Sequence, residues 1–269
     1  MKNLSKLYAL ALSLIMLLSC TALAENDNSL QYILDKGTFI VGLDPAFPPM
    51  GFDEDGEIKG YDIDLAREVC ERLGVELVCQ PIDWLSKEME LNGFNIDCIW
   101  NGLSINPDRE DSMNLSIPYL NNNQVFVVKN NSAIETFRDL SGKIVGLQGG
   151  SSAEDALNDA ADLLETLGEV VPVDDYAIAL MDLDVGGVDA VLMDEVVANY
   201  YITAKQADYR ILTENLVPEL YTIGFRKADE ALNGKVEEIL MDMAQDGKLA
   251  EITIKWFGKD ISLLTKEAE

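Results

Sequence analysis

The stretch GYDIDLAREVCERLGVELV, residues 60–78, decides the fold class of this chain. Its apolar residues recur at the spacing of a helix that buries one face, namely Ile63, Ala66, Val69, Cys70 and Leu73. We expect Asp62 to cap the start of this helix and Gly74 to end it. A β-rich run at 75–78 follows at once, so helix gives way directly to strand.

Strands and helices alternate along the rest of the chain. Short β-rich runs predict strands at 38–42, 96–100, 125–128, 144–147, 190–193 and 221–226. Apolar periodicity predicts helices at 174–183, 195–203, 229–245 and 249–256. Residues 53–58 are expected to form a hairpin that turns at Asp55-Gly56. The alternation indicates an α/β protein with a mostly parallel sheet and helices on its faces.

Composition and charge exclude several classes of function. The chain has 269 residues, 48% of them hydrophobic, which suits one large or two medium domains. It carries 20 Lys and Arg against 48 Asp and Glu, a formal net charge of −28, and it has no histidine. Nucleic-acid binding is therefore not expected, and a Ser-His-Asp triad or a His-ligated zinc is impossible. Carboxylate chemistry, oxygen-ligated metals and binding without chemistry remain.

Residues 1–24 are expected to be a signal peptide and not part of the fold. A positively charged start is followed by an apolar run at 7–18, which is too short to span a membrane. Two processing sites compete: a lipobox-like LLSC would leave a lipidated Cys20, whereas an A-x-A site would be cleaved after Ala24. We favour cleavage after Ala24, and both alternatives predict an exported protein.

Three cysteines lie beyond the predicted signal peptide: Cys70, Cys79 and Cys98. An odd number in an exported chain leaves at least one free thiol. We expect them to be small buried apolar residues, with a Cys70–Cys79 disulfide as the alternative. A catalytic cysteine is not expected, because the chain has no histidine to act as its base.

Seven segments together identify a family. In chain order they are VGLDPAFPPMGF (41–52), GYDIDLAREVCERLG (60–74), NGLSINPDRED (101–111), IPYL (117–120), KIVGLQGGSSAEDAL (143–157), GVDAVLMDEVVANYYI (187–202) and DGKLAEITIKWFG (246–258). In order and spacing they resemble the extracytoplasmic solute-binding proteins of polar amino acid ABC transporters, over nearly all of the mature chain. The resemblance implies a type II periplasmic-binding-protein-like fold, with two lobes joined by two crossover strands and a ligand cleft between them.

The same resemblance implies the domain limits and the function. Lobe 1 would comprise 25–121 and 219–269, lobe 2 would comprise 122–218, and the hinge strands would lie near 120–124 and 217–221. The protein would bind a free amino acid by hinge closure and deliver it to an ABC permease with its cytoplasmic ATPase. We expect a monomer in the periplasm or at the outer face of the membrane, with no cofactor, metal or catalytic residue.

Residues for the two charged ends of an amino acid follow from matching motif positions. Arg109 matches the arginine that binds the ligand carboxylate, a role suited to its two parallel donors. Asp194 matches the aspartate that receives the α-ammonium, and a helix cap is the structural alternative for it. The other positions that match contacts to the carboxylate end are Gly102, Ser104, Ser151 and Ser152.

The ligand side chain is expected to lie among aromatic residues. Phe47, Phe52 and Trp84 are the predicted walls, although an aromatic residue is more often part of a core. Asp44 matches an acidic position near the polar end of the ligand, and Asn101 departs from the small residue that is commoner in the family. These residues do not identify the amino acid that is bound.

Two other functions compete with transport. An enzyme on the same fold, such as a dehydratase of a cyclic amino-acid precursor, would need a proton-transfer group, and the missing histidine argues against it. The ligand-sensing module of a receptor is the second. The excess of acid is interpreted mainly as a solvated surface, because exposed charge is screened beyond about 8 Å and does not specify a substrate.

Overall fold

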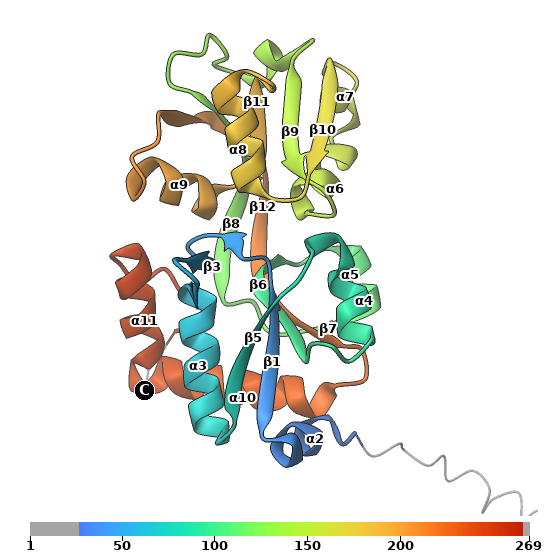
Figure 1. Ribbon diagram of the computed structural model, residues 1–269, viewed down its shortest axis with the longest axis vertical. Coiled ribbons are helices and arrows are strands. Elements are labelled where there is room, and N and C mark those ends of the chain that lie inside the picture. Colours follow the sequence, from blue (N-terminus) through green and yellow to red (C-terminus); the bar gives the residue numbers. More distant parts are fainter. Residues whose placement is uncertain (1–26, 266–269) are drawn as a thin grey trace, which may run out of the picture.

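The computed structural model describes residues 27–265 and shows two α/β parts stacked along the long axis of the molecule (Figure 1). Two long strands, β8 (Leu120–Lys129) and β12 (Tyr209–Arg226), run from one part into the other. The predicted signal peptide, with its alternative processing sites at Cys20 and Ala24, lies outside the described residues.

The lower part of Figure 1 is built from both ends of the described chain. Its strands are β1 (Thr38–Leu43), β2 (Ala46–Phe47), β3 (Gly51–Glu54), β4 (Glu57–Lys59), β5 (Glu76–Pro81), β6 (Cys98–Ser104) and β7 (Met113–Leu115). Its helices are α2 (Ser29–Lys36), α3 (Tyr61–Leu73), the 3₁₀ turn Trp84–Ser86, α4 (Lys87–Asn92), α5 (Pro107–Ser112), α10 (Glu230–Asp246) and α11 (Lys248–Phe257). Strand β1 pairs in parallel with β5 on one side and β6 on the other.

The upper part is formed by the middle of the chain. Its strands are β9 (Ile144–Gln148), β10 (Glu169–Val173) and β11 (Ala190–Asp194), with β9 parallel to both others. Its helices are the 3₁₀ turn Phe137–Leu140, α6 (Ser152–Asp159), α7 (Ala161–Leu164), α8 (Tyr176–Val185) and α9 (Glu195–Thr203). The alternating α/β architecture predicted from the sequence is confirmed, but the sheet is mixed and not mostly parallel, because β8 and β12 pair antiparallel with each other and with their other neighbours.

The crossing strands join both parts into one sheet of order β10-β9-β11-β8-β12-β6-β1-β5. Strands β8 and β12 pair antiparallel, with Leu120 opposite Tyr221 and Gln124 opposite Val217. Successive side chains of a strand point to opposite faces. Accordingly, Asn122 and Gln124 are buried on the face toward the centre of the molecule, whereas Asn121 is exposed.

Helix α3 confirms the helix predicted between Asp62 and Gly74, but not its predicted cap. Four of the five predicted apolar positions are buried, and Gly74 ends the helix in a left-handed conformation. The N-cap is Gly60, and the prediction for Asp62 is wrong. Its side chain is buried, where Oδ2 accepts from the Gly102 N–H at 2.8 Å and Oδ1 accepts from the Tyr119 hydroxyl at 2.8 Å. Asp62 fails as a cap because it faces inward, toward β6.

Other predicted elements agree closely with the structure. The hairpin of β3 and β4 turns at Asp55-Gly56, as expected, and α9 has its predicted ends. The largest difference is β12, which begins at Tyr209 although only 221–226 is recognisable in the sequence. Residues 213–220 mix polar and apolar side chains without the alternation that is typical of a strand. They form a strand because they pair with β8, and the local sequence pattern does not indicate it.

The cysteines are free thiols throughout residues 27–265. Cys70 and Cys98 are buried, as expected for small apolar residues, and Cys79 is half-buried. Burial raises the pKa of the Cys70 thiol to about 12, which makes it a poor nucleophile. The alternative Cys70–Cys79 disulfide is not formed.

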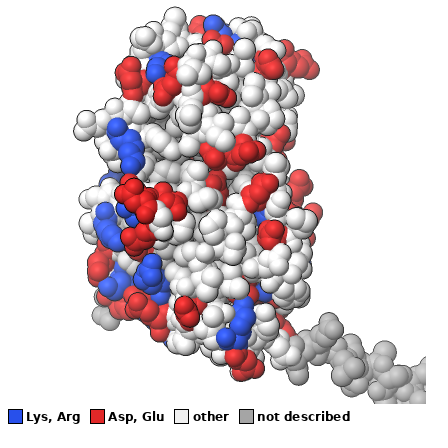
Figure 2. Space-filling model, in the orientation of Figure 1, with Lys and Arg blue, Asp and Glu red and all other residues white. Residues whose placement is uncertain are grey.

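Acidic side chains are spread over the surface of both parts and do not gather in one patch on the face that Figure 2 shows. This distribution is what a generally solvated acidic surface would give. Among the helices of residues 27–265, none has the length and apolar character required to cross a bilayer.

We expect Ile63→Ala to destabilise the protein by about 3 kcal/mol. The reason is that the Ile63 side chain is fully buried on the inner face of α3, so its truncation leaves a cavity. The thermal unfolding midpoint should fall by about 6–12 °C. Glu71→Ala on the exposed face of the same helix is the matched control and should change stability by less than about 0.5 kcal/mol. Equal effects of the two substitutions in a thermal unfolding assay would contradict the packing of α3.

Candidate functional site

A small cavity lies between the lower and the upper part and is lined by side chains from both. The lining residues are Phe47, Trp84, Gly102 and Arg109 from below and Gln148, Ser151, Ser152 and Asp194 from above. All of them except Gln148 are predicted site residues. The enclosed volume is about 10 Å³, which is room for about one water molecule. An amino acid could enter only if the two parts moved apart.

Arg109 is buried on the short helix α5, which follows the end of β6. Asn106 caps this helix by accepting from the Arg109 N–H at 2.8 Å, which anchors the arginine backbone. The guanidinium Nη1 donates to the Ser104 carbonyl at 2.7 Å. Burial lowers the pKa of Arg109, while the charges of Asp155, Glu219 and Asp194 oppose that shift. The structure therefore holds a desolvated cation at the cavity.

Asp194 ends β11 and faces Arg109 across the cavity from the upper part. Its Oδ1 accepts from Asn122 Nδ2 at 2.7 Å and from the Tyr221 hydroxyl at 2.6 Å, and its Oδ2 accepts from the Tyr176 hydroxyl at 2.9 Å. Burial, and then the charge of Glu219, raises the pKa of Asp194 to about 7. Asp194 occupies the N-cap position of α9, where the structural alternative placed it, but its side chain makes no capping hydrogen bond to that helix.

The predicted serines connect the two parts directly. Ser152 Oγ donates to Ser104 Oγ at 3.2 Å across the interface, and Ser104 Oγ donates onward to Glu219 at 2.8 Å. Ser151 caps α6 by accepting from the Glu154 N–H at 3.4 Å, and its hydroxyl donates to the Gln148 carbonyl at 2.7 Å. The serine hydroxyls therefore have protein partners, and the first backbone N–H groups of α6 remain as donors for an anion.

Gly102 has the conformation that its position at the cavity requires. Its φ is +61°, and a Cβ atom there would lie 2.7 Å from Phe47 Cε1. Glycine therefore allows the Phe47 ring to rest on β6. The Gly102 N–H donates to Asp62, so it is not free for a ligand.

Asp44 and Gln148 form a polar pair at the border of the cavity. Asp44 Oδ2 accepts from Gln148 Nε2 at 2.7 Å, and Oδ1 accepts from the Ala46 N–H at 2.8 Å. Burial raises the pKa of Asp44 to about 6. Asn101 lies behind this pair and holds its loop, accepting from the Asp44 N–H at 3.0 Å and donating to the Gly51 carbonyl at 3.3 Å.

The predicted aromatic walls separate into two groups. Phe47 and Trp84 line the cavity, and the Phe47 ring centroid lies 5.8 Å from that of Tyr176. Phe52 is placed outside the lining, where it packs against Tyr200 at 5.6 Å and Trp256 at 6.1 Å between centroids. A ligand contact for Phe52 stays a prediction that this arrangement does not support.

Comparison with known proteins identifies the family. Residues 39–259 match the bacterial extracellular solute-binding proteins, family 3. The chain belongs to this family. The predicted resemblance is thereby confirmed, and the match covers both parts of this family 3 protein.

Relatives of this family 3 protein carry the names of binding proteins. The L-cystine-binding protein TcyJ of Escherichia coli (strain K12) is 29% identical over 94% of each chain. The L-cystine-binding protein TcyA of Bacillus subtilis (strain 168) is 30% identical over 93% of this chain and 98% of its own. The structure of an ABC uptake transporter substrate-binding protein from Streptococcus pneumoniae with bound histidine is 37% identical, with a TM-score of 0.86 over 89% of this chain and 100% of that one.

Sequence reasoning missed several residues of the family 3 site. Gln148 and Glu219 were not singled out, and neither were the polar residues that hold Asp194: Asn122, Tyr176 and Tyr221. The polar run 121–124 lies in a segment expected to be a hinge strand. Because successive side chains of a strand point to opposite faces, every second residue of this run could have been predicted to face the site. Glu219 stands among other acidic and apolar residues without a distinguishing pattern.

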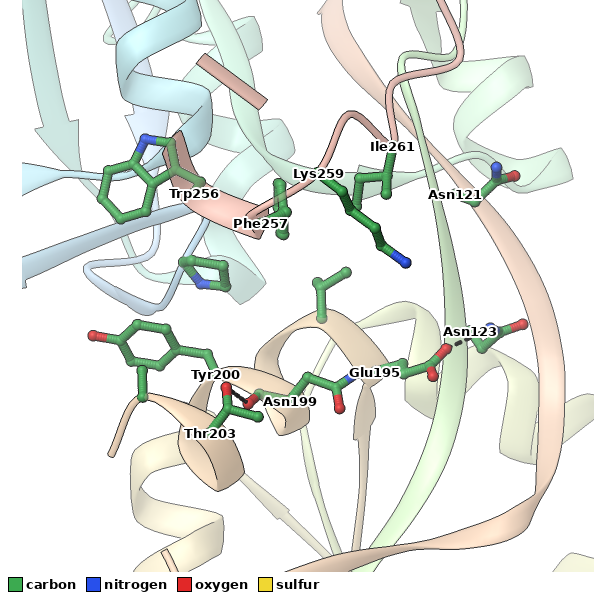
Figure 3. A pocket seen from close by; sticks show the side chains of 13 residues that line it. Asn121, Asn123, Glu195, Asn199, Tyr200, Thr203, Trp256, Phe257, Lys259 and Ile261 are labelled. Atoms are coloured by element: carbon green, nitrogen blue, oxygen red, sulfur yellow. Dashed lines mark hydrogen bonds between the residues drawn. The ribbon is translucent and has the colours of Figure 1, made fainter. Parts of the chain in front are cut away.

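A second hollow lies on the outer face of the crossing strands and contains no predicted site residue (Figure 3). Its volume is about 580 Å³, and Tyr200 of α9 and Trp256 of α11 flank it. Asn121 and Asn123, which alternate with the inward amides of β8, form one side, and Asn123 Nδ2 donates to Glu195.

In its closed arrangement without ligand, the family 3 protein should lose stability as pH rises, because burial raises the pKa of Asp44 to about 6 and of Asp62 and Asp194 to about 7. A carboxyl group with a raised pKa stabilises the fold below its ordinary pKa, and this stability is lost as pH rises through the folded value. The unfolding midpoint should therefore fall between about pH 4 and about pH 8.

Asp194→Asn removes one of these groups and should show a smaller fall over the same range. General repulsion among the excess carboxylates is common to both proteins, so the difference reports Asp194. Parallel pH curves for the two proteins, measured after refolding to remove any ligand, would contradict the burial of an ionisable group at this position.

Proposed function

We propose that this protein works outside the cytoplasm. It binds a free amino acid in the cavity between its two parts and delivers the amino acid to the membrane permease of an ABC transporter. One observation carries the proposal: Arg109 and Asp194, both buried and from opposite parts, line the same cavity. A free amino acid has one carboxylate and one ammonium group, and both must be paired where water is excluded. Membership of the family supports the same function.

Each charged end of the ligand has a matched partner in this proposal. The Arg109 guanidinium offers two parallel donors to the carboxylate, and the N-terminus of α6 at Ser151 and Ser152 offers backbone N–H groups. Asp194 accepts from the ammonium while its tyrosine and asparagine partners hold it in place. The ligand side chain lies toward Phe47, Trp84 and the Asp44–Gln148 pair.

We further propose a polar side chain, because the Asp44–Gln148 pair places a carboxylate and an amide at that end of the cavity. The relatives named for L-cystine and the relative with bound histidine agree with this class. The proposed activity is binding without chemical conversion, which the names of the relatives support. Location in the periplasm or at the extracytoplasmic face of the cell membrane, with a lipid anchor at Cys20 as the alternative, also belongs to the proposal.

Hinge closure is the proposed mechanism, with lobe 1 at 25–121 and 219–269 and lobe 2 at 122–218. The paired strands β8 and β12 cross between the two parts. Away from these strands, side-chain hydrogen bonds also connect the lower part to the upper part. Lys87 Nζ donates to the Gly150 carbonyl at 2.9 Å, and Asn106 Nδ2 donates to Asp155 at 3.0 Å. Such contacts form only when the two parts are close, so they favour the closed arrangement.

Refolded wild-type protein should be stabilised by at least one of the common L-amino acids or L-cystine. A ligand at about a hundredfold over its Kd adds about 2.7 kcal/mol, which is a rise of about 5–11 °C in a thermal-shift assay. A flat response to the whole set would overturn the proposed function.

Two variants connect that response to the site. Arg109→Lys keeps the charge but loses the paired donors, so the affinity for the stabilising amino acid should fall at least about tenfold. Arg138→Lys is the matched control, because Arg138 is exposed on the upper part. Equal affinities of the two variants would show that Arg109 does not bind the carboxylate.

Ligand should also make the protein more compact in solution, because the proposed hinge closure starts from an arrangement more open than the described one, whose cavity of about 10 Å³ leaves no way in for an amino acid. Small-angle scattering should give a smaller radius of gyration with the stabilising amino acid than without it. The Arg109→Lys variant at the same ligand concentration should compact less. Scattering curves that coincide with and without saturating ligand would contradict hinge closure.

A further inference from the structure

Glu219 occupies the crossing strand β12 beside the ligand cavity, and one of its oxygens collects three hydrogen bonds. Oε2 accepts from Ser104 Oγ at 2.8 Å, from Asn122 Nδ2 at 3.0 Å and from Gln124 Nε2 at 2.9 Å. The donors come from β6 of the lower part and from the crossing strand β8. A single carboxylate oxygen therefore joins three strands at the hinge.

The same donors reach the residues that line the cavity. Asn122 Nδ2 also donates to Asp194 Oδ1 at 2.7 Å, so one amide group bridges two carboxylates. Ser104 Oγ accepts from Ser152 Oγ at 3.2 Å, and Gln124 Nε2 donates to Ser152 Oγ at 3.3 Å. Glu219 thus orients the polar groups around the ligand site without itself lining the cavity.

Bringing two carboxylates together has an electrostatic consequence. The charge of Glu219 adds to burial in raising the pKa of Asp194 to about 7. Arg109 of α5 faces both carboxylates, and Tyr176 of α8 and Tyr221 of β12 donate to Asp194. The groups of β6 and β8 that bond to the pair are uncharged, namely Ser104, Asn122 and Gln124, while Asp155 of α6 lies near Arg109.

We propose that Glu219 is a positioning residue of the ligand site whose negative charge couples arrival of the ligand ammonium to release of a proton from Asp194. This inference rests on the proposed function. In the closed arrangement without ligand, the Asp194 carboxyl group beside Glu219 holds its proton below about pH 7. The ammonium then pairs with the Asp194 carboxylate, and the displaced proton leaves to solvent. Binding therefore weakens as pH falls below about 7, because the proton competes for the same oxygens.

The Glu219→Gln variant separates this charge effect from a structural role. Glutamine keeps a carbonyl oxygen for the donors of β6 and β8 but carries no charge. The matched control is Glu195→Gln: Glu195 accepts from Asn123, the neighbour of Asn122 on the outer face of β8. Both substitutions remove one carboxylate that is bonded to an asparagine of the same strand.

The decisive measurement is a carbon-detected NMR titration of ligand-free protein labelled at the aspartate carboxyl carbons. The Asp194 signal is assigned as the one lost in Asp194→Asn. Its midpoint should fall by about one pH unit in Glu219→Gln, the size expected when a neighbouring like charge is removed, and should stay in place in Glu195→Gln. An unchanged midpoint in Glu219→Gln would overturn the proposal, whatever happens to affinity.

Ligand binding provides the second measurement, with an equimolar mixture of the common L-amino acids and L-cystine as the probe. The stabilisation of wild-type protein should be larger at about pH 8 than at about pH 6, and Glu219→Gln should show a smaller pH dependence. An equal loss at both pH values would indicate a purely structural role and overturn the proposal. A flat wild-type response with a lowered NMR midpoint would overturn amino-acid binding while leaving the Glu219–Asp194 coupling established.

Discussion

The antiparallel pairing of β8 with β12 is the contact on which the rest of the site depends. It joins both parts of the molecule and sets which side chains of the crossing strands face inward. Asn122 and Gln124 on one strand and Glu219 and Tyr221 on the other all reach the neighbourhood of Asp194 because of this register. A slip of one residue would turn a strand's inward side chains to the opposite face, so the site and the hinge share one structural origin.

The site resolves a conflict between burial and charge. Asp194 lies in an environment that penalises its ionised form, yet it is held by three hydrogen bonds that an ionised carboxylate accepts. Arg109 is equally buried and donates to a carbonyl group. Charged groups kept this far from water are costly unless an opposite charge reaches them. An amino acid supplies an opposite charge to both residues at once, which explains how a small zwitterion holds the two parts together around it.

Local sequence patterns were sufficient for most elements and insufficient where distant contacts prevail. The α9 helix and the β3–β4 hairpin appear with their predicted positions because apolar periodicity and an Asp-Gly turn act over a few residues. The short helices α4 and α5 give too few turns for a periodic signal. Asp62 has the residue type of a cap, but its side chain bonds to Gly102 and Tyr119 because packing against β6 turns it inward.

By itself the sequence determined the α/β class, because helix and strand patterns alternate along it. It also indicated the family and the two oppositely charged residues of the site, because short motifs that resemble the family contain them. Arg109 and Asp194 could be named from the residues beside them. Only the tertiary structure decided that Glu219 stands next to Asp194 and that Phe52 packs away from the cavity. The reason is physical: side chains far apart in the chain meet through strand register and the approach of the two parts, and neither is encoded by local spacing.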